Sequence, residues 1–167
     1  MKIQNLLTFI SLLGSALFAQ GAPLEVGAAA PAVTAIDQDG KTINFKDFYA
    51  KGPTLVYFYP KSDTPGCTKQ ACSLRDEWSA LKEKGIQVIG VSGDKPEEQK
   101  AFIDKHKLPF PIVADHDFKV AEAFGSPQRA RNSFLIKDGK VAWTMLKAST
   151  TTHAQDVLQA YDQLAKK

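Results

Sequence analysis

Two cysteines are the residues of this chain best suited to chemistry. Cys67 and Cys72 are its only cysteines, and they lie in the run YPKSDTPGCTKQAC (residues 59–72), where a β-rich stretch gives way to a helical pattern. A structural disulfide is the usual role of a cysteine pair in an exported chain. A bridge across so short a loop removes little chain entropy, and a domain of this size folds without one. The spacing therefore indicates a chemical function.

The position of Cys67 favours a reactive thiol. Pro65 suits the first position of a helix, where its missing N–H costs nothing. Thr64 is then the N-cap and Cys67 the third helical residue, where free N–H groups and the positive helix end stabilise a thiolate. Gly66 is expected to leave space for a small substrate beside the sulfur. An inert buried cysteine on an apolar stripe is the alternative, and it does not explain why strand, turn, N-cap and proline coincide.

Hydrophobic periodicity predicts the elements that position this run. Cys67 begins an apolar seam that continues at offsets of 4, 7, 11 and 14 residues, which is one face of a helix ended by Gly85. Strands are expected at 33–36, 42–45, 54–59, 88–91, 109–113, 133–136 and 141–145, and helices at 65–84, 94–106, 119–124 and from 152 onward. Capping patterns start the helices at Asp94 and Thr152. Alternating strands and helices predict an α/β fold with a central mixed β-sheet flanked by helices, compatible with a thioredoxin-like fold.

Composition limits the other functions. The chain has 167 residues, 44% of them hydrophobic and 23% charged, which is typical of one globular domain. Its net charge of +3 comes without any long basic run, so no nucleic-acid partner is expected. His106, His116 and His153 lack metal-ligand spacing and are expected at the surface or at helix caps. Trp78 and Trp143 are expected in the core.

The first residues resemble a secretory signal peptide. A positive start at Lys2 is followed by an uncharged apolar run from Leu6 to Ala19 and then by small residues. The run is shorter than the roughly 20 residues that span a bilayer, so no membrane anchor is expected. We therefore expect a signal peptide at 1–21, cleaved within 19–23, and a mature domain at 22–167 that is exported, either periplasmic or secreted.

The cysteine run resembles a known family. Pro60-x3-Thr64-x2-Cys67 is similar to the active-site signature of peroxiredoxins, and the longer string resembles their bacterioferritin-comigratory or peroxiredoxin Q branch, in which a second cysteine follows five residues later. The segments VIGVSGD, LPFPIVAD and RNSFLIKDGKV match that branch in order and spacing. The similarity covers roughly residues 24–165.

The resemblance implies a role for each matching residue. Cys67 would be the peroxidatic nucleophile and Cys72 the resolving cysteine. Thr64 would hydrogen-bond the peroxide, and Pro60 would shield the pocket. Arg131 would stabilise the thiolate and polarise the O–O bond, which suits a fixed guanidinium. Arg129 and Arg75 are rival arginines, and Arg75 is also placed to pair at the surface with Asp76 or Glu77.

The implied reaction needs neither a metal nor an organic cofactor. The Cys67 thiolate would attack a hydroperoxide and become a sulfenic acid, and the Cys72 thiolate would then attack that sulfur to form a disulfide and release water. A thioredoxin-like dithiol would reduce that disulfide by exchange. Many relatives have no targeting segment, so the reductant of an exported copy is open. Because both cysteines lie in one chain, a monomer is expected.

Two other functional classes compete. A copper-binding assembly protein of the same fold would need more closely spaced cysteines and a distal histidine. A thiol–disulfide oxidoreductase acting on proteins usually has its cysteines two residues apart. The spacing of Cys67 and Cys72 argues against both classes.

Helix geometry predicts that this chemistry requires movement. Five residues along an α-helix separate two Cα atoms by about 8.7 Å. A disulfide needs a separation of about 4.4–6.8 Å. The helix is therefore expected to unwind over roughly residues 66–73 before Cys67 and Cys72 can bond.

Overall fold

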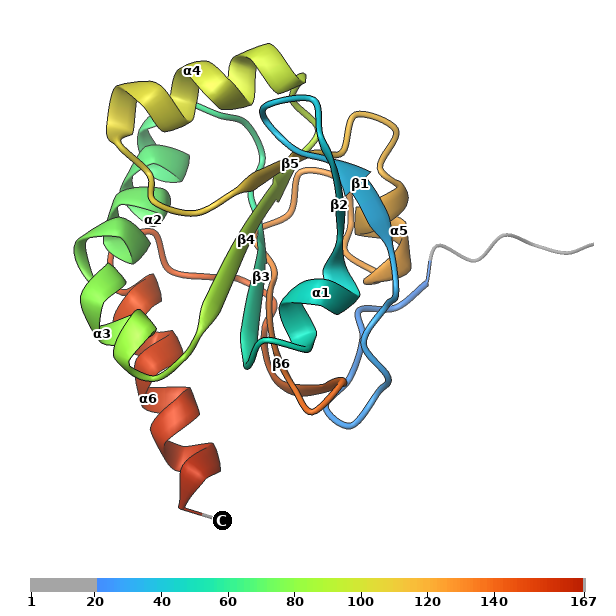
Figure 1. The fold of residues 1–167 in the computed structure, drawn as a ribbon, viewed down its shortest axis with the longest axis vertical. Helices are drawn as coiled ribbons and strands as arrows, with labels where there is room; N and C mark the ends of the chain where they lie inside the picture. Colours follow the sequence, from blue (N-terminus) through green and yellow to red (C-terminus); the bar gives the residue numbers. More distant parts are fainter. Residues whose placement is uncertain (1–20, 167) are drawn as a thin grey trace, which may run out of the picture.

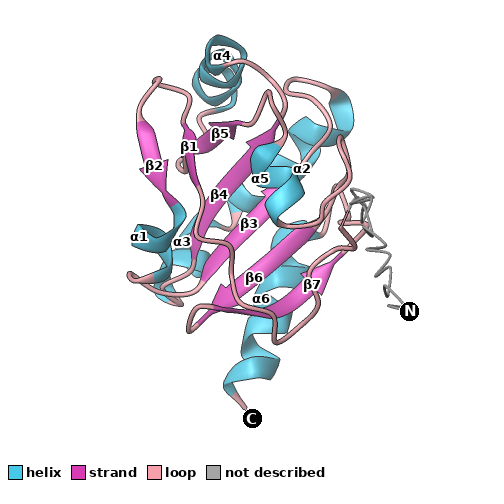
Figure 2. Cartoon of the chain, turned by 90° about the vertical axis from the view of Figure 1, so that its right-hand side faces the viewer, coloured by secondary structure: helices cyan, strands magenta, loops and turns pink. Residues whose placement is uncertain are grey.

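A five-stranded mixed sheet, in the order β5-β4-β3-β6-β7, forms the centre of the molecule (Figures 1 and 2). The computed structural model describes residues 21–166, so the expected signal peptide lies almost wholly outside the described residues. The strands are β1 (Thr34–Ile36), β2 (Thr42–Asn44), β3 (Thr54–Phe58), β4 (Gln87–Ser92), β5 (Ile112–Ala114), β6 (Ser133–Lys137) and β7 (Lys140–Met145). The helices are α1 (Phe45–Tyr49), α2 (Pro65–Asp76), α3 (Trp78–Glu83), α4 (Pro96–His106), α5 (Lys119–Ala123) and α6 (His153–Ala165).

Strand β3 is the central strand, and its pairing confirms the expected mixed sheet. It runs parallel to β4 and antiparallel to β6, with Tyr57 opposite Ser133. All five residues of β3 are buried, as expected for a strand covered on both faces. Because β6 is antiparallel to β3, the start of β6 lies beside the end of β3, and the N–H of Phe58 donates to the Asn132 carbonyl at 2.8 Å. The pairing therefore brings the residues before Ser133 to the loop that leads to Cys67.

The two faces of the sheet carry separate cores. One face packs against α2, α3, α4 and α6, and its buried residues include Leu55, Cys67, Leu74 and Val157. The other packs against α1 and α5 through aromatic residues such as Phe45 and Phe124. The apolar seam predicted from the sequence faces the core, as expected, because its residues Cys67, Ala71, Leu74 and Leu81 are buried. Trp78 and Trp143 are partly buried and pack against the same core.

Two helix boundaries differ from the expectation. The helix expected over 65–84 is two helices, α2 and α3, divided at Glu77, whose backbone leaves the helical region (φ −96°, ψ 15°). The seam continues across the break, so periodicity alone did not reveal it. Helix α1 was not expected; it begins where a strand was expected to end, because the Asn44 side chain accepts from the Lys46 N–H and caps a helical turn.

One expected cap is wrong, and a second is correct in position but lacks the expected hydrogen bonds. The N-cap of α4 is Lys95, not Asp94, because the Asp94 carboxylate is bonded to the loop after β3. Thr152 is the N-cap of α6, but its hydroxyl donates to Asp156 and Gln155 donates to Glu77, so the expected capping box does not form.

Among the described helices, none has the length and apolar character needed to cross a bilayer.

Candidate active site

Cys67 lies in the first turn of α2, and its side chain is buried, with only 1% of the residue exposed. Thr64 is the N-cap with an extended backbone, and Pro65 is the first helical residue, as expected. The Thr64 hydroxyl does not cap the helix; it donates to the Lys61 carbonyl at 3.0 Å. The N–H groups of Gly66 and Cys67 precede the first intrahelical bond, which runs from Thr68 to the Thr64 carbonyl. Cys67 therefore lies in a turn that holds free N–H donors and the positive end of α2, a setting that suits an anion.

The Arg131 guanidinium lies against this same turn. It precedes β6, and its Nη1 donates to the amide oxygen of Gln70 at 3.0 Å. A Cβ atom at Gly66 would lie only 2.8 Å from Arg131 Nη2 and 3.6 Å from the Thr150 methyl group. The space left by the missing side chain of Gly66, expected to admit substrate, is therefore taken up by a cation beside the cysteine.

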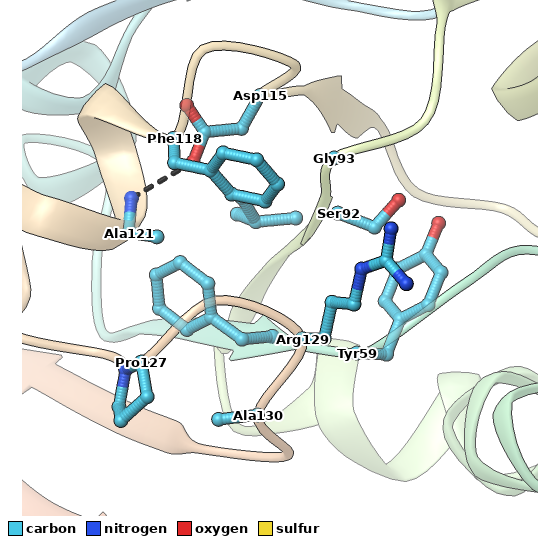
Figure 3. Close-up of a pocket in the computed structure, with 11 residues that line it drawn as sticks. Tyr59, Ser92, Gly93, Asp115, Phe118, Ala121, Pro127, Arg129 and Ala130 are labelled. Atoms are coloured by element: carbon cyan, nitrogen blue, oxygen red, sulfur yellow. Dashed lines mark hydrogen bonds between the residues drawn. The ribbon is translucent and has the colours of Figure 1, made fainter.

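The two rival arginines lie elsewhere. Arg75 donates to Asp76 at 2.7 and 2.9 Å, the surface pair that was expected, and to the His106 carbonyl at 2.8 Å. Arg129 adopts a left-handed backbone (φ 61°) and lines a small cavity of about 10 Å³ with Asp115 and other residues (Figure 3). Neither Cys67 nor Arg131 lines that cavity.

A buried polar cluster holds the loop between β3 and α2. The Asp94 carboxylate accepts from the Ser62 N–H at 2.6 Å and from the Ser92 hydroxyl at 2.8 Å. Burial raises the pKa of Asp94, but these hydrogen bonds outweigh it and hold the pKa below its usual value. Ser62 and Tyr59 both donate to the amide oxygen of Gln99 on α4. The loop is thereby fixed to β4 and α4, and with it the start of α2.

A second set of contacts ties the loop to α4 at the surface. Asp63, in the left-handed region (φ 58°), bonds to Lys105 at 2.6 Å and to His106 at 2.8 Å. Hydrogen bonds from His106 and then Lys105 lower the pKa of Asp63. Lys61 is largely exposed and pairs with Asp94 and Glu98 at 3.5 and 3.4 Å. Exposed pairs of this kind contribute little each, so the buried cluster is the main restraint.

Cys72 lies on the same continuous helix as Cys67. It is half-buried, and both cysteines are free thiols. The expectation that α2 runs through both residues is confirmed. Their separation along the helix prevents a disulfide in this conformation. Pro60 is half-buried at the end of β3, two residues before Ser62, whose N–H bonds to Asp94.

The sequence did not reveal a buried polar chain behind Arg131. Gln70, one turn after Cys67, is fully buried, and its amide nitrogen lies 3.4 Å from Nδ1 of His153. Nε2 of His153 lies 2.8 Å from the Ser133 hydroxyl. His153 is the first residue of α6, but it is fully buried and hydrogen-bonded in the core, not at the surface or acting as a cap. Burial lowers its pKa to about 4, so the imidazole is neutral at ordinary pH.

The other histidines have no comparable setting. His106 bonds Asp63 at the edge of α4, and His116 is exposed. Within residues 21–166, no three His, Cys, Asp or Glu side chains come together as a metal ion would require.

Comparisons with known proteins agree with this geometry. The model of the AhpC/TSA family matches residues 26–144. Peroxiredoxin Bcp of Escherichia coli is 42% identical over 148 residues, which cover 81% of this chain and 94% of the relative. Chloroplastic peroxiredoxin Q of Populus jackii is 46% identical over 106 residues, which cover 64% of this chain and only 49% of the relative, about half its length.

Solved structures give the same result. Peroxidoxin BcpB from Mycobacterium tuberculosis superimposes with a TM-score of 0.79 at 27% identity, covering 84% of this chain and 98% of the other. A structure of Xanthomonas campestris peroxiredoxin Q gives 0.78 at 25% identity, covering 84% and 98%. The thioredoxin-like fold is confirmed. The chain therefore belongs to the AhpC/TSA family, within the peroxiredoxin Q and Bcp group of thiol-dependent peroxidases.

Proposed function

We propose that Cys67 is the peroxidatic nucleophile of this peroxidase and that Cys72 resolves it within the same chain. The observation that carries the proposal is the buried thiol of Cys67 in the first turn of α2, with the guanidinium of Arg131 packed against Gly66 in that turn. A helix start and a fixed cation both stabilise a thiolate. The first step is attack of this thiolate on the distal oxygen of a hydroperoxide.

The surrounding residues suit that step. As the S–O bond forms, the O–O bond breaks, sulfur is oxidised to the sulfenic acid, and the leaving oxygen takes a proton and departs as water or an alcohol. Arg131 stabilises the negative charge that develops on the leaving oxygen. The Thr64 hydroxyl donates to Lys61, so its own oxygen is free to accept a hydrogen bond from the peroxide O–H. Pro60 borders the loop and shields the sulfur from water.

The substrate class we propose includes hydrogen peroxide and organic hydroperoxides. One structural neighbour, the Xanthomonas campestris bacterioferritin comigratory protein, is described by its alkyl peroxide reduction activity; it has a TM-score of 0.76 and 25% identity to this chain. Peroxiredoxins are reduced by thioredoxin-like partners. For this chain we propose a dithiol protein that attacks the Cys67–Cys72 disulfide, and we propose that the enzyme works as a monomer.

We also propose that the enzyme acts outside the cytoplasm. Lys2 and the apolar run from Leu6 to Ala19 support a signal peptide over residues 1–21. Within the described residues, the first backbone hydrogen bond to the domain comes from Leu24, which donates to the Phe124 carbonyl at 3.2 Å. Cleavage before Pro23 is therefore compatible with an intact fold.

Replacing Cys67 with serine tests the assignment of the nucleophile. A serine hydroxyl is hardly ionised at neutral pH, so Cys67→Ser should reduce peroxide turnover to the uncatalysed rate. The measurement is peroxide consumption with a thioredoxin-like reductant, with circular dichroism as the control for folding. Substantial turnover by a folded Cys67→Ser protein would exclude Cys67 as the nucleophile.

Replacing Arg131 with lysine tests the role of the guanidinium. Lysine keeps the charge but loses the planar fork, so the second-order rate of Cys67 oxidation should fall on the order of 10²-fold. Single-turnover kinetics with hydrogen peroxide measure this rate. Arg129→Lys and Arg75→Lys are the matched controls and should retain the rate of the unmodified enzyme. If Arg131→Lys reacts at the normal rate and one of the two control variants is slow, the arginine changed in that control is the one that assists Cys67 oxidation.

Opening of α2 is testable by amide hydrogen exchange. The Cys67–Cys72 disulfide does not fit a continuous helix, so exchange across residues 66–73 should be faster in the oxidised enzyme than in the reduced enzyme. Strand β4 (Gln87–Ser92) serves as the internal control and should be equally protected in both forms. Equal protection of residues 66–73 in the two forms would mean that resolution needs no unwinding.

Export is testable on protein made in its native cell. Mass spectrometry should find a mature N-terminus between Gln20 and Pro23, in the fraction outside the cytoplasm. An intact start at Met1 on the native protein would rule out cleavage.

A further inference from the structure

A chain of buried polar side chains leads from the core to Arg131. The Ser133 hydroxyl lies 2.8 Å from Nε2 of His153, Nδ1 of His153 lies 3.4 Å from the amide nitrogen of Gln70, and the amide oxygen of Gln70 lies 3.0 Å from Nη1 of Arg131. Ser133, His153 and Gln70 have no exposed surface. Ser133, His153 and Gln70 have no part in the peroxidatic chemistry proposed above.

The hydrogen-bond donors and acceptors of these four side chains fit together in only one way. A guanidinium can only donate, so the oxygen of the Gln70 amide has to face Arg131. The amide nitrogen of Gln70, a donor, then faces Nδ1 of His153, which has to accept. The imidazole proton is therefore on Nε2 and is donated to Ser133.

Neighbouring contacts hold the His153 imidazole in the orientation that these hydrogen bonds need. The ring of Tyr57 packs edge-on to His153 with the centroids 5.7 Å apart. The N–H of Ala154 donates to the Ser73 hydroxyl at 3.1 Å, which ties the start of α6 to α2. Burial keeps His153 neutral, because it lowers the pKa to about 4. Residue 153 thus presents a fixed acceptor to Gln70.

We propose that His153 is a positioning residue for peroxide reduction: its neutral imidazole orients the Gln70 amide, which then holds the Arg131 guanidinium against the first turn of α2. Without an acceptor at position 153, only Arg131 would favour this orientation of the Gln70 amide, and the buried amide nitrogen would lack a partner. An amide that turned to satisfy its nitrogen would weaken its hydrogen bond to the guanidinium and loosen the guanidinium from the first turn of α2. The inference rests on the proposed role of Arg131.

Two substitutions at position 153 separate orientation from packing. His153→Leu removes the acceptor, whereas His153→Asn supplies a side-chain oxygen in place of Nδ1. We expect His153→Leu to slow the single-turnover oxidation of Cys67 at least about tenfold. It should also raise the pKa of the Cys67 thiol, measured from the pH dependence of alkylation. His153→Asn should restore most of the rate. Val157→Ala, a buried apolar change one turn further along the same helix, is the stability control and should leave the rate unchanged.

A change at Gln70 provides the sharper test. In Gln70→Glu both oxygens of the side chain accept, so the orientation of residue 70 no longer depends on residue 153. Adding His153→Leu to Gln70→Glu should therefore slow oxidation much less than it does in the unmodified enzyme. An equal slowing in both backgrounds would show that His153 acts independently of Gln70 and would overturn the proposal.

The remaining outcomes are also decisive. A normal rate for His153→Leu, while Arg131→Lys is slow, overturns this inference and leaves the peroxidase mechanism intact. A normal rate for Arg131→Lys removes the role of Arg131 and this inference with it. If His153→Leu does not fold, nitrogen NMR of the unmodified enzyme decides: the proton should be on Nε2 of His153 at neutral pH, and a proton on Nδ1 would overturn the proposal.

Discussion

The close approach of the Arg131 guanidinium to the backbone of Gly66 is the contact on which the site depends. It requires a residue without a side chain at position 66, a helix that starts one residue earlier at Pro65, and a β6 strand that begins beside the end of β3. The antiparallel pairing of β3 and β6 supplies the last condition, because it brings Arg131 and Cys67 together from positions far apart in the chain. The turn that carries the buried Cys67 side chain thus lies at the positive start of α2 and against the guanidinium.

The same helix creates the opposing constraint. Helical structure at Cys67 favours the thiolate, yet it also keeps Cys72 too far away to form a disulfide. The enzyme would therefore need one conformation to react with peroxide and another to resolve the product. The contacts of Asp94 with Ser62 and of Asp63 with α4 lie before the helix, so they can persist while α2 opens. Gln70 lies within the opening segment, so the same movement would release Arg131 from its acceptor.

Local patterns accounted for much of the fold and for the centre of the site. Pro65 and Thr64 predicted the start of α2, and buried β-rich runs predicted β3 and β4, because such signals lie within a few neighbouring residues. Arg131 was identified by resemblance and not by spacing. Gln70 and His153 are 83 positions apart, and only tertiary packing brings them together, so no local pattern marks them as partners. The use of Asp94 by a distant loop was missed for the same reason, whereas the division of the helix at Glu77 was missed because the apolar seam continues across it.

The most direct test of the central claim is the mass of a Cys72→Ser protein after treatment with one equivalent of hydrogen peroxide. With the resolving thiol removed, the account predicts that the protein gains a single oxygen atom, located on Cys67 by peptide mapping and removed by a dithiol reductant. A protein whose mass is unchanged under conditions in which the unmodified enzyme is fully oxidised, or one that carries the oxygen on another residue, would contradict the assignment of Cys67 as the group that attacks peroxide.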